Sequence, residues 1–330
     1  MVNLVGKRYW FFLVSLLIIV PGLISLAIPP ALKVGIDFTS GSMMTMQFAD
    51  PSAVSQSDLR AELTTLGHGE AVIQRSGDQW LIRTGNLDPE QRDAQGNVTQ
   101  PPEQQQIQDA LTERFGQQAT LVEFTQVSPA IAAEVVQNAT LAVVLASIGI
   151  LLYITWAFRK VPRPFRYGTC AIVALLHDVL IVIGVYSILG KLFNMEVDAM
   201  FITAVLTVIG FSIHDTIVVF DRIRENMRKA GGVNFPNVVN HSLLQTMGRS
   251  ISTSLTVVLT LTALLVFGGV TIRSFVLVLL IGIISGTYSS IFNASQLLVA
   301  WEQRDWDRWL TRFRGTPAIA KDPRGSVRAR

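Results

Sequence analysis

Long apolar runs alternate with polar segments along this chain. Six runs are long and nearly free of charge; they occupy residues 9–28, 138–158, 167–189, 199–220, 250–268 and 275–300. A helix rising about 1.5 Å per residue crosses about 30 Å of hydrocarbon with roughly 20 residues. The pattern therefore predicts an integral membrane protein with six transmembrane helices.

The polar segment 29–137 has shorter periodicities, which are typical of a folded domain. Alternating apolar positions predict strands near 44–48, 71–74, 80–83 and 120–124. Helical periodicity predicts one helix that is capped by Ser57 and a second helix over 103–115. The order βαββαβ is that of a ferredoxin-like α+β domain. The polar insertion between Asn86 and Pro102 is predicted to be a mobile surface loop.

Composition supports the membrane assignment and excludes some chemistry. Half of the 330 residues are hydrophobic and 15% are charged. The single cysteine, Cys170, lies in the third apolar run, which excludes a disulfide framework and a cysteine-based metal site. The sequence has no phosphate loop, zinc-protease motif or nucleophile elbow, so we expect no enzyme activity and no cofactor.

Charge is distributed unevenly and predicts the orientation. Residues 29–137 contain six Lys/Arg and fourteen Asp/Glu, whereas the short loop 159–166 has four bases and no acid. Basic short loops stay cytoplasmic. We therefore expect both termini inside the cell and 29–137 outside. The predicted parts are an anchor helix (1–28), an external domain (29–137), a five-helix bundle (138–301) with cytoplasmic loops 159–166 and 221–249, and a basic cytoplasmic tail (302–330).

The fourth run carries ionisable residues inside an apolar segment. His214 and Asp215 precede its charged end. A carboxylate at membrane depth either pairs with a cation or is driven by desolvation to hold a proton, and such residues are generally functional. Asp215 is therefore a candidate for proton binding, and His214 either modulates it or faces another polar neighbour.

Several separated motifs resemble those of the SecF family of bacterial protein-export proteins. They cover nearly the whole chain: GIDFTSG at 35–41, ALLHDVLI at 174–181, VIGFSIHDTIVVFDRIREN at 208–226, QTMGRSISTS at 245–254, FGG at 267–269 and GTYSSIF at 286–292. Two positions depart from the family pattern. Ser40 replaces a glycine of the first motif, and His214 replaces the usual asparagine before the aspartate.

The resemblance implies a half-transporter of the resistance-nodulation-division superfamily in the bacterial inner membrane. Its implied partners are a SecD-like subunit, the SecYEG channel, the translocating polypeptide and membrane lipids, with no nucleic acid. The implied energy source is the proton-motive force. The family's intramembrane pair matches Asp215 and Arg249, and this pair would couple proton movement to motion of the external domain during late translocation.

Other polar residues in the predicted spans each admit two interpretations. His177 and Asp178 either relay protons or stabilise the Asp215 site electrostatically, or they hold helices together by hydrogen bonds. Thr253, Thr256 and Thr260 lie on one face of the helix that Arg249 begins. They either support a water chain or bond to their own backbone carbonyls, and Arg249 itself is either the proton-site partner or an interfacial anchor.

Small residues mark two further features. Gly282, Gly286 and Ser290 recur every four residues in the sixth run and predict close helix packing, within the chain or with a partner. In the first motif, Gly35, Asp37 and Gly41 form either a hinge between the first span and the external domain or a rigid turn.

Two other functions compete with proton-driven export. One is a translocon scaffold that conducts no protons, in which the buried charges are structural. The other is half of a proton-driven exporter of small molecules or lipids, which keeps the proton chemistry and changes the cargo.

Overall fold

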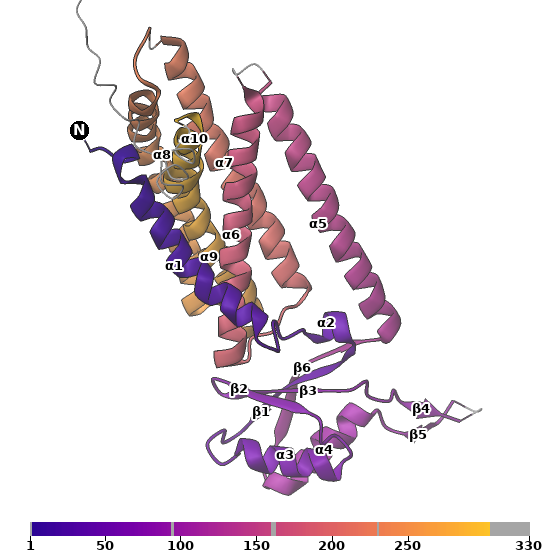
Figure 1. Ribbon diagram of the computed structural model, residues 1–330. Helices are drawn as coiled ribbons and strands as arrows, with labels where there is room; N and C mark the ends of the chain where they lie inside the picture. The colour runs from indigo at the N-terminus through magenta and orange to yellow at the C-terminus, as the bar shows by residue number, and fades with distance from the viewer. Residues whose placement is uncertain (1, 94–95, 160–162, 230, 304–330) are drawn as a thin grey trace, which may run out of the picture.

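The computed structural model describes residues 2–93, 96–159, 163–229 and 231–303 and has two parts, a helix bundle and a smaller α/β domain at one end of it (Figure 1). Six helical runs in the described residues are long and apolar enough to cross a membrane. They are Val5–Ala27, Pro129–Ala157, Pro164–Phe193, Ala199–Lys229, Phe235–Phe267 and Ile272–Glu302. The prediction of six transmembrane helices with one α+β domain is confirmed.

The first run joins a 3₁₀ turn (Val5–Lys7) to α1 (Arg8–Ala27), and the next four runs are α5 (Pro129–Ala157), α6 (Pro164–Phe193), α7 (Ala199–Lys229) and α8 (Phe235–Phe267). The last run comprises α9 (Val270–Ser289), a π-helical turn (Ser290–Ala294) and α10 (Ser295–Glu302). Helices α6 and α7 and the last run are the most buried, whereas α5 is mostly exposed and stands apart from the other helices over much of its length (Figure 1).

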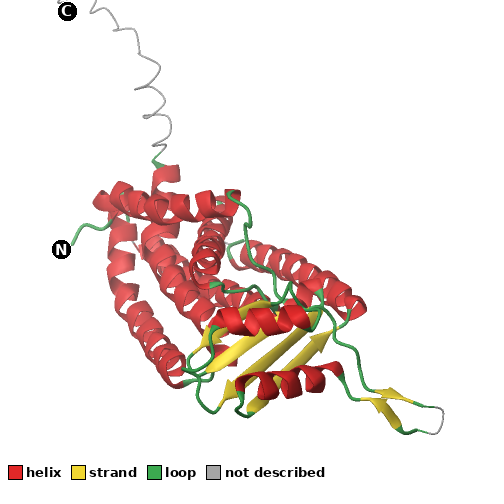
Figure 2. Cartoon of the chain, turned by 90° about the horizontal axis from the view of Figure 1, so that it is seen from below, coloured by secondary structure: helices red, strands yellow, loops and turns green. Residues whose placement is uncertain are grey.

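The α/β domain contains β1 (Gly41–Phe48), α3 (Gln56–Thr65), β2 (Val72–Ser76), β3 (Gln79–Thr84), α4 (Glu103–Phe115) and β6 (Ala119–Val127). The sheet order is β2-β3-β1-β6 with antiparallel neighbours, so β1 and β2 run parallel with β3 between them. This is the predicted split βαββαβ unit. Helices α3 and α4 cover the sheet face that lies away from the bundle (Figures 1 and 2).

Alternation along β1 builds the core of this domain. Met44, Met46 and Phe48 point to one face and are buried against the two helices through Leu59 and Leu111. Since successive strand residues point to opposite faces, this alternation fixes the register of the sheet.

Several predicted boundaries differ from the structure. Ser55, rather than Ser57, caps α3, because its hydroxyl accepts a hydrogen bond from the N–H of Asp58. The insertion 86–102 contains a short hairpin, β4 (Gln91–Arg92) and β5 (Val98–Gln100), although it was predicted to be a loop.

The bundle also starts and turns at other residues than expected. Helix α5 begins at Pro129 because Ser128 caps it and proline fits the first helical position, so the α/β domain ends before residue 137. The predicted loop 221–249 is mostly helical, since α7 continues to Lys229 and α8 begins at Phe235. Most of the predicted basic tail, from residue 304, and residues 160–162 of the loop 159–166 lie outside the described residues.

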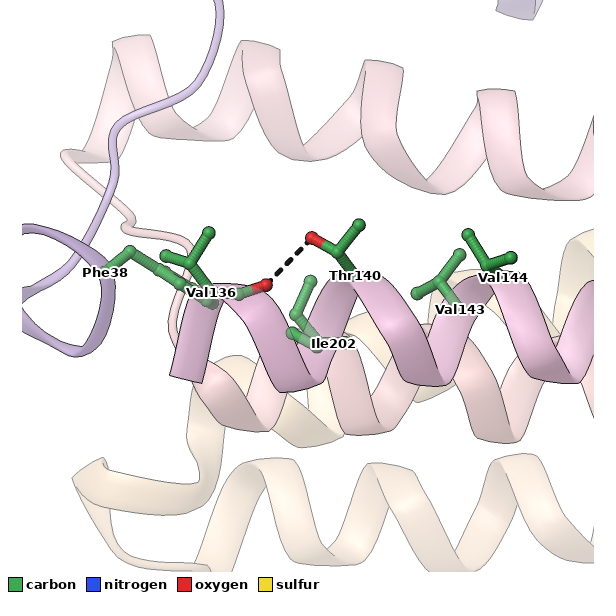
Figure 3. A pocket seen from close by; sticks show the side chains of 7 residues that line it. Phe38, Val136, Thr140, Val143, Val144 and Ile202 are labelled. Atoms are coloured by element: carbon green, nitrogen blue, oxygen red, sulfur yellow. Dashed lines mark hydrogen bonds between the residues drawn. The ribbon is translucent and has the colours of Figure 1, made fainter. Parts of the chain in front are cut away.

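A short helix, α2 (Ile36–Thr39), lies between the two parts of the molecule and contacts α5. Beside it, α5 and α7 border an apolar crevice of about 310 Å³ (Figure 3). Its lining residues are Phe38, Val136, Ala139, Thr140, Val143, Val144 and Ile202. None of these lining side chains is ionisable, and the one polar group among them, the hydroxyl of Thr140, donates to the carbonyl of Val136 one turn earlier.

Candidate functional site

Asp178 of α6 is the centre of a buried polar network. Its side chain has 0% exposure. One carboxylate oxygen accepts from Ser212 (2.6 Å) and Ser289 (2.6 Å), and the other accepts from Ser285 (2.7 Å) and from Nδ1 of His177 (3.0 Å). A carboxylate offers about four acceptor sites, so this one is fully satisfied.

The network continues through His177 to the first helix. Nε2 of His177 lies 2.9 Å from Nδ2 of Asn293, which also donates to the hydroxyl of Ser15 at 2.8 Å. Because Nε2 accepts here, the proton of the neutral imidazole lies on Nδ1, where it can be donated to Asp178. The network therefore ties together α1, α6, α7 and the last helical run.

The π-helical turn adds two polar residues to the contacts that Ser285 and Ser289 of the same run make. It contains Ser290 and Asn293, and the hydroxyl of Ser290 lies 2.9 Å from that of Thr216 on α7. Such single turns insert one extra residue in a helix and frequently occur at functional sites. Here Asn293 of the turn contacts α1 and α6, and Ser290 contacts α7.

Gly282 and Gly286 bring α9 against α7 within this chain. A Cβ at Gly282 would collide with the side chain of Val208, and one at Gly286 would lie 3.0 Å from Cβ of Ser212. Small residues allow this close approach, which holds Ser285 and Ser289 within reach of Asp178. Of the predicted packing residues, Ser290 contacts the same helix through Thr216.

Asp215 lies one turn beyond Ser212 on α7 and has a different environment. It is 5% exposed, and its Oδ2 atom has no hydrogen-bond partner among the described residues. Arg249 and His214 are within electrostatic range. In the described part of the chain, however, neither forms an ion pair with it. Asp215 is thus a buried acid without the full partner set that fixes Asp178.

The expected partners of Asp215 lie on the outside of the bundle. His214, Arg249, Thr253 and Thr256 are all exposed. The Thr253 hydroxyl donates to the carbonyl of Arg249 (3.0 Å), and Thr256 donates to that of Thr253 (2.7 Å). These bonds match the interpretation in which the threonines satisfy their own helix. The exposed side chains of His214, Arg249, Thr253, Thr256 and Thr260 are called the polar stripe below.

The first motif lies where the α/β domain meets the bundle. Asp37 accepts a hydrogen bond from the first N–H of α7 at Ala199 (2.8 Å). Gly41 has φ +128°, and a Cβ there would lie 2.7 Å from the carbonyl oxygen of Thr84. Gly35 approaches Val197 closely. All three hinge candidates are therefore placed at the junction, in contact with β3 or with the start of α7.

Sequence reasoning missed several polar residues of this region. The serines that bind Asp178 come from two helices, Ser212 from α7 and Ser285 and Ser289 from α9, and serine is common in membrane helices, so they gave no individual signal. Gln296 was also missed: it is fully buried, and neither polar atom of its side chain has a partner among the described residues. A glutamine inside an otherwise apolar run was the one signal that pointed to it.

The two buried acids are suited to different chemistry: Asp178 to a fixed state and Asp215 to binding and releasing a proton. Asp178 is held by four donors, whereas Asp215 has a free acceptor atom and lies next to the polar stripe. A search of the described residues finds no group of three or more His, Cys, Asp or Glu that could hold a metal ion.

Comparisons with known proteins agree with this architecture. Residues 106–304 match the family "Protein export membrane protein SecD/SecF, C-terminal". Protein translocase subunit SecF of Thermobaculum terrenum is 51% identical over 93% of this chain and 96% of the relative, and that of Anaerolinea thermophila is 44% identical over 94% and 98%.

Longer relatives contain a region similar to this chain as one part of their length. SecDF of Bacillus subtilis is 34% identical over 91% of this chain and 38% of its own length. The crystal structure of SecDF, a translocon-associated membrane protein from Thermus thermophilus, is 34% identical with a TM-score of 0.77, and the match covers 92% of this chain and 39% of that one. This chain therefore spans about two fifths of the SecDF proteins that it resembles.

Proposed function

Since this chain belongs to the SecD/SecF family of protein-export membrane proteins, we propose that it couples proton binding at Asp215 to movement of the α/β domain during export. It is a multi-pass membrane protein with a role in protein export. In the proposed mechanism Asp215 alternates between a protonated state and a charged state that pairs with Arg249, and α7 changes position between the two.

The observation that carries this proposal is the contrast between the two buried acids. Asp178 has four donors and is fixed, whereas Asp215 has an oxygen with no partner among the described residues. A buried carboxylate that lacks partners is stabilised by taking up a proton, and it regains charge when a cation approaches. Asp178 binds α7 through Ser212, and Asp215 belongs to α7. A change at Asp215 therefore acts on a helix that the network otherwise holds in place.

The polar stripe is an argument for a second subunit that covers it. Arg249 is exposed at the start of the apolar run of α8, where a charge facing lipid is costly, and a second subunit would cover it. The fused SecDF relatives carry additional chain in the same polypeptide. The partner in the proposed complex is accordingly a SecD-type subunit, and the complex works at the Sec channel in the bacterial inner membrane. Both termini are proposed to be cytoplasmic, with the α/β domain on the outer side.

The proposed energy source is the proton-motive force, without a bound cofactor or enzymatic step. The test is proton-gradient-stimulated export of a secretory protein in membranes that contain this chain and its SecD-type partner. We expect Asp215→Asn to abolish the stimulation at unchanged assembly. Asp221→Asn is the matched control, because Asp221 is on the same helix, exposed and ion-paired with Arg224. Retained stimulation in Asp215→Asn would refute the proposed coupling.

The scaffold function is the second candidate, and the Asp178 network is the observation that favours it. Exchanging the charges with Asp215→Arg and Arg249→Asp separates the two candidates. A scaffold with a structural charge pair tolerates the exchange and supports export. A proton carrier assembles with exchanged charges but loses the stimulation by the gradient.

A further inference from the structure

Two backbone segments meet at the junction between the α/β domain and the bundle. Val34, after α1, and Val197, between α6 and α7, form a parallel bridge. The N–H of Gly35 donates to the carbonyl of Val197 at 2.8 Å. A Cβ at Gly35 would lie 3.1 Å from that oxygen, so a glycine suits this close approach.

The bridge leads directly into α7. The carboxylate of Asp198 accepts from the N–H of Phe201 at 2.7 Å, and that of Asp37 accepts from the N–H of Ala199 at 2.8 Å. Carboxylates stabilise a helix N-terminus by accepting from its free N–H groups. The segment after α1 and the start of α7 are thereby joined as one unit. Asp215 lies further along the same helix, α7.

A side chain of the sheet reaches this unit from the α/β domain. Arg83 of β3 forms an ion pair with Glu196, and its Nη1 also donates to the carbonyl of Val34 at 3.1 Å. The two charged side chains are 24% and 22% exposed. On β2, Gln74 donates to the carbonyl of Asn194 at 2.9 Å. Arg83 is therefore the charged contact between the sheet and the segment that begins α7.

Arg83 is the main cation that compensates the charge of Glu196. Burial raises the pKa of Glu196, while Arg83 and then Lys33 oppose this shift and Asp198 adds to it. Asp37 faces Asp198 in turn. A half-buried carboxylate that loses its cation is left with an uncompensated desolvation cost, whereas neutralising both partners removes that cost.

We propose that Arg83 and Glu196 are positioning residues that hold the α/β domain on the end of α7, so that displacement of this helix is passed to the domain. The inference rests on the proposed function, because it says how a change at Asp215 reaches the domain. From Ala199 to Asp215 the helix is continuous, over about 24 Å at about 1.5 Å per residue. A rigid helix of this length moves both ends together.

The test is a distance measurement by pulsed electron paramagnetic resonance on the full chain in nanodiscs. Spin labels are placed at Gln105→Cys on α4 and Leu192→Cys on α6, with Cys170→Ala as background. Arg83→Gln is expected to raise the population of undocked domain about tenfold, because Glu196 loses its cation. Arg60→Gln, an exposed change on α3, is the matched control and should leave the distribution unchanged.

Rescue and pH dependence separate positioning from general destabilisation. Adding Glu196→Gln to Arg83→Gln is expected to return the undocked population to within about twofold of wild type, since no buried charge remains. In Arg83→Gln alone the raised pKa of Glu196 makes the docked state bind the proton more tightly. Its docked population should therefore rise as the pH is lowered through the raised pKa and fall as the pH is increased.

Three results would overturn the inference: a wild-type distribution in Arg83→Gln, a double variant as undocked as Arg83→Gln, or no pH dependence in the single variant. If Arg83→Gln does not fold, Glu196→Lys replaces it and should undock the domain by repulsion. The exchange Arg83→Glu with Glu196→Lys should then restore docking, and failure to restore it would equally overturn the inference. Docking of the domain is measured without export, so the two failures can be told apart. Failure of the docking test refutes the role of Arg83 and Glu196, whereas retained stimulation in Asp215→Asn refutes the proposed function.

Discussion

At the scale of single residues, Asp178 and Asp215 lie on neighbouring helices and have opposite surroundings. Asp178 accepts from three serine hydroxyls and one imidazole, whereas Oδ2 of Asp215 has no partner in the described chain. Two carboxyl groups in environments this different generally have different tasks. The first is suited to holding helices together and the second to changing its charge.

This contrast predicts how the two alanine variants will differ in stability. Asp178→Ala removes the acceptor of four donors, of which Ser289 keeps a second acceptor in the carbonyl of Gly286. At about 1–3 kcal/mol for each buried unsatisfied group, we expect a loss of several kcal/mol. Asp215→Ala removes a group with few partners, and its loss should stay within about 1 kcal/mol. Thermal unfolding of both variants in nanodiscs measures the difference. Equal losses would contradict the assigned roles.

A second prediction at this scale concerns pH at the start of α7. Burial raises the pKa of Asp198 above its ordinary value of 3.8, and the charge of Asp37 adds to the shift. The folded state then binds the proton more tightly than the unfolded state, so the stabilising contribution of Asp198 decreases as pH rises from 3.8 to the raised value. Asp198→Asn keeps the capping oxygen and loses the titration.

The measurement is the melting temperature of wild type minus that of Asp198→Asn across acidic pH. We expect this difference to fall as pH rises through that window. Asp50→Asn is the control with opposite sign, because hydrogen bonds from Ser52 lower the pKa of Asp50. Its contribution is present above the ordinary pKa and is lost as pH falls. The same slope for both variants would contradict the assignment.

At the scale of elements, the contact between α7 and α9 depends on missing side chains. Gly282→Ala places a methyl group against Val208, so we expect a loss of about 1–3 kcal/mol, typical of overpacking. Gly210→Ala, on α7 itself, meets no atom within 4 Å and should be neutral or slightly stabilising. Unfolding of the two variants in the same detergent tests this, and a neutral Gly282→Ala would contradict the packing.

Elements of this molecule follow from the sequence to different degrees. Apolar run length predicted the six spans, and alternation at Met44, Met46 and Phe48 predicted β1 with its buried face. Helix ends were less accurate, since α7 continues through charged residues to Lys229, where hydropathy no longer indicates helix. Propensity and local ion pairs keep such ends helical after they leave the apolar layer.

Contacts between elements were the part that periodicity could not supply. Arg83 and Glu196 are 113 positions apart, and the serines around Asp178 come from α7 and α9. Their meeting depends on how whole helices and the sheet pack together, which no local pattern specifies. Motif resemblance did select Asp215 and Arg249, but the isolated chain does not join them in an ion pair among its described residues.

At the scale of the whole molecule, the polar stripe on α7 and α8 is the surface that the proposed partner half would cover. Arg249 is exposed on α8 at the start of the apolar run 250–268, and a carboxylate or other polar groups of a partner would compensate its charge. The fused SecDF relatives are consistent with such a second half. The stripe should therefore determine association rather than the fold of the chain alone.

Arg249→Ala is accordingly expected to leave the melting temperature of the isolated chain unchanged, because the side chain is exposed there. Its affinity for the SecD-type half should fall by more than tenfold, since a buried charge on the partner would lose its counter-ion at a cost of about 2 kcal/mol or more. Arg228→Ala, another exposed arginine at the end of α7, should bind as wild type. Binding in nanodiscs measures this. Unchanged affinity in Arg249→Ala would mean that the stripe faces lipid, and its arginine would then have to reach the membrane surface along α8.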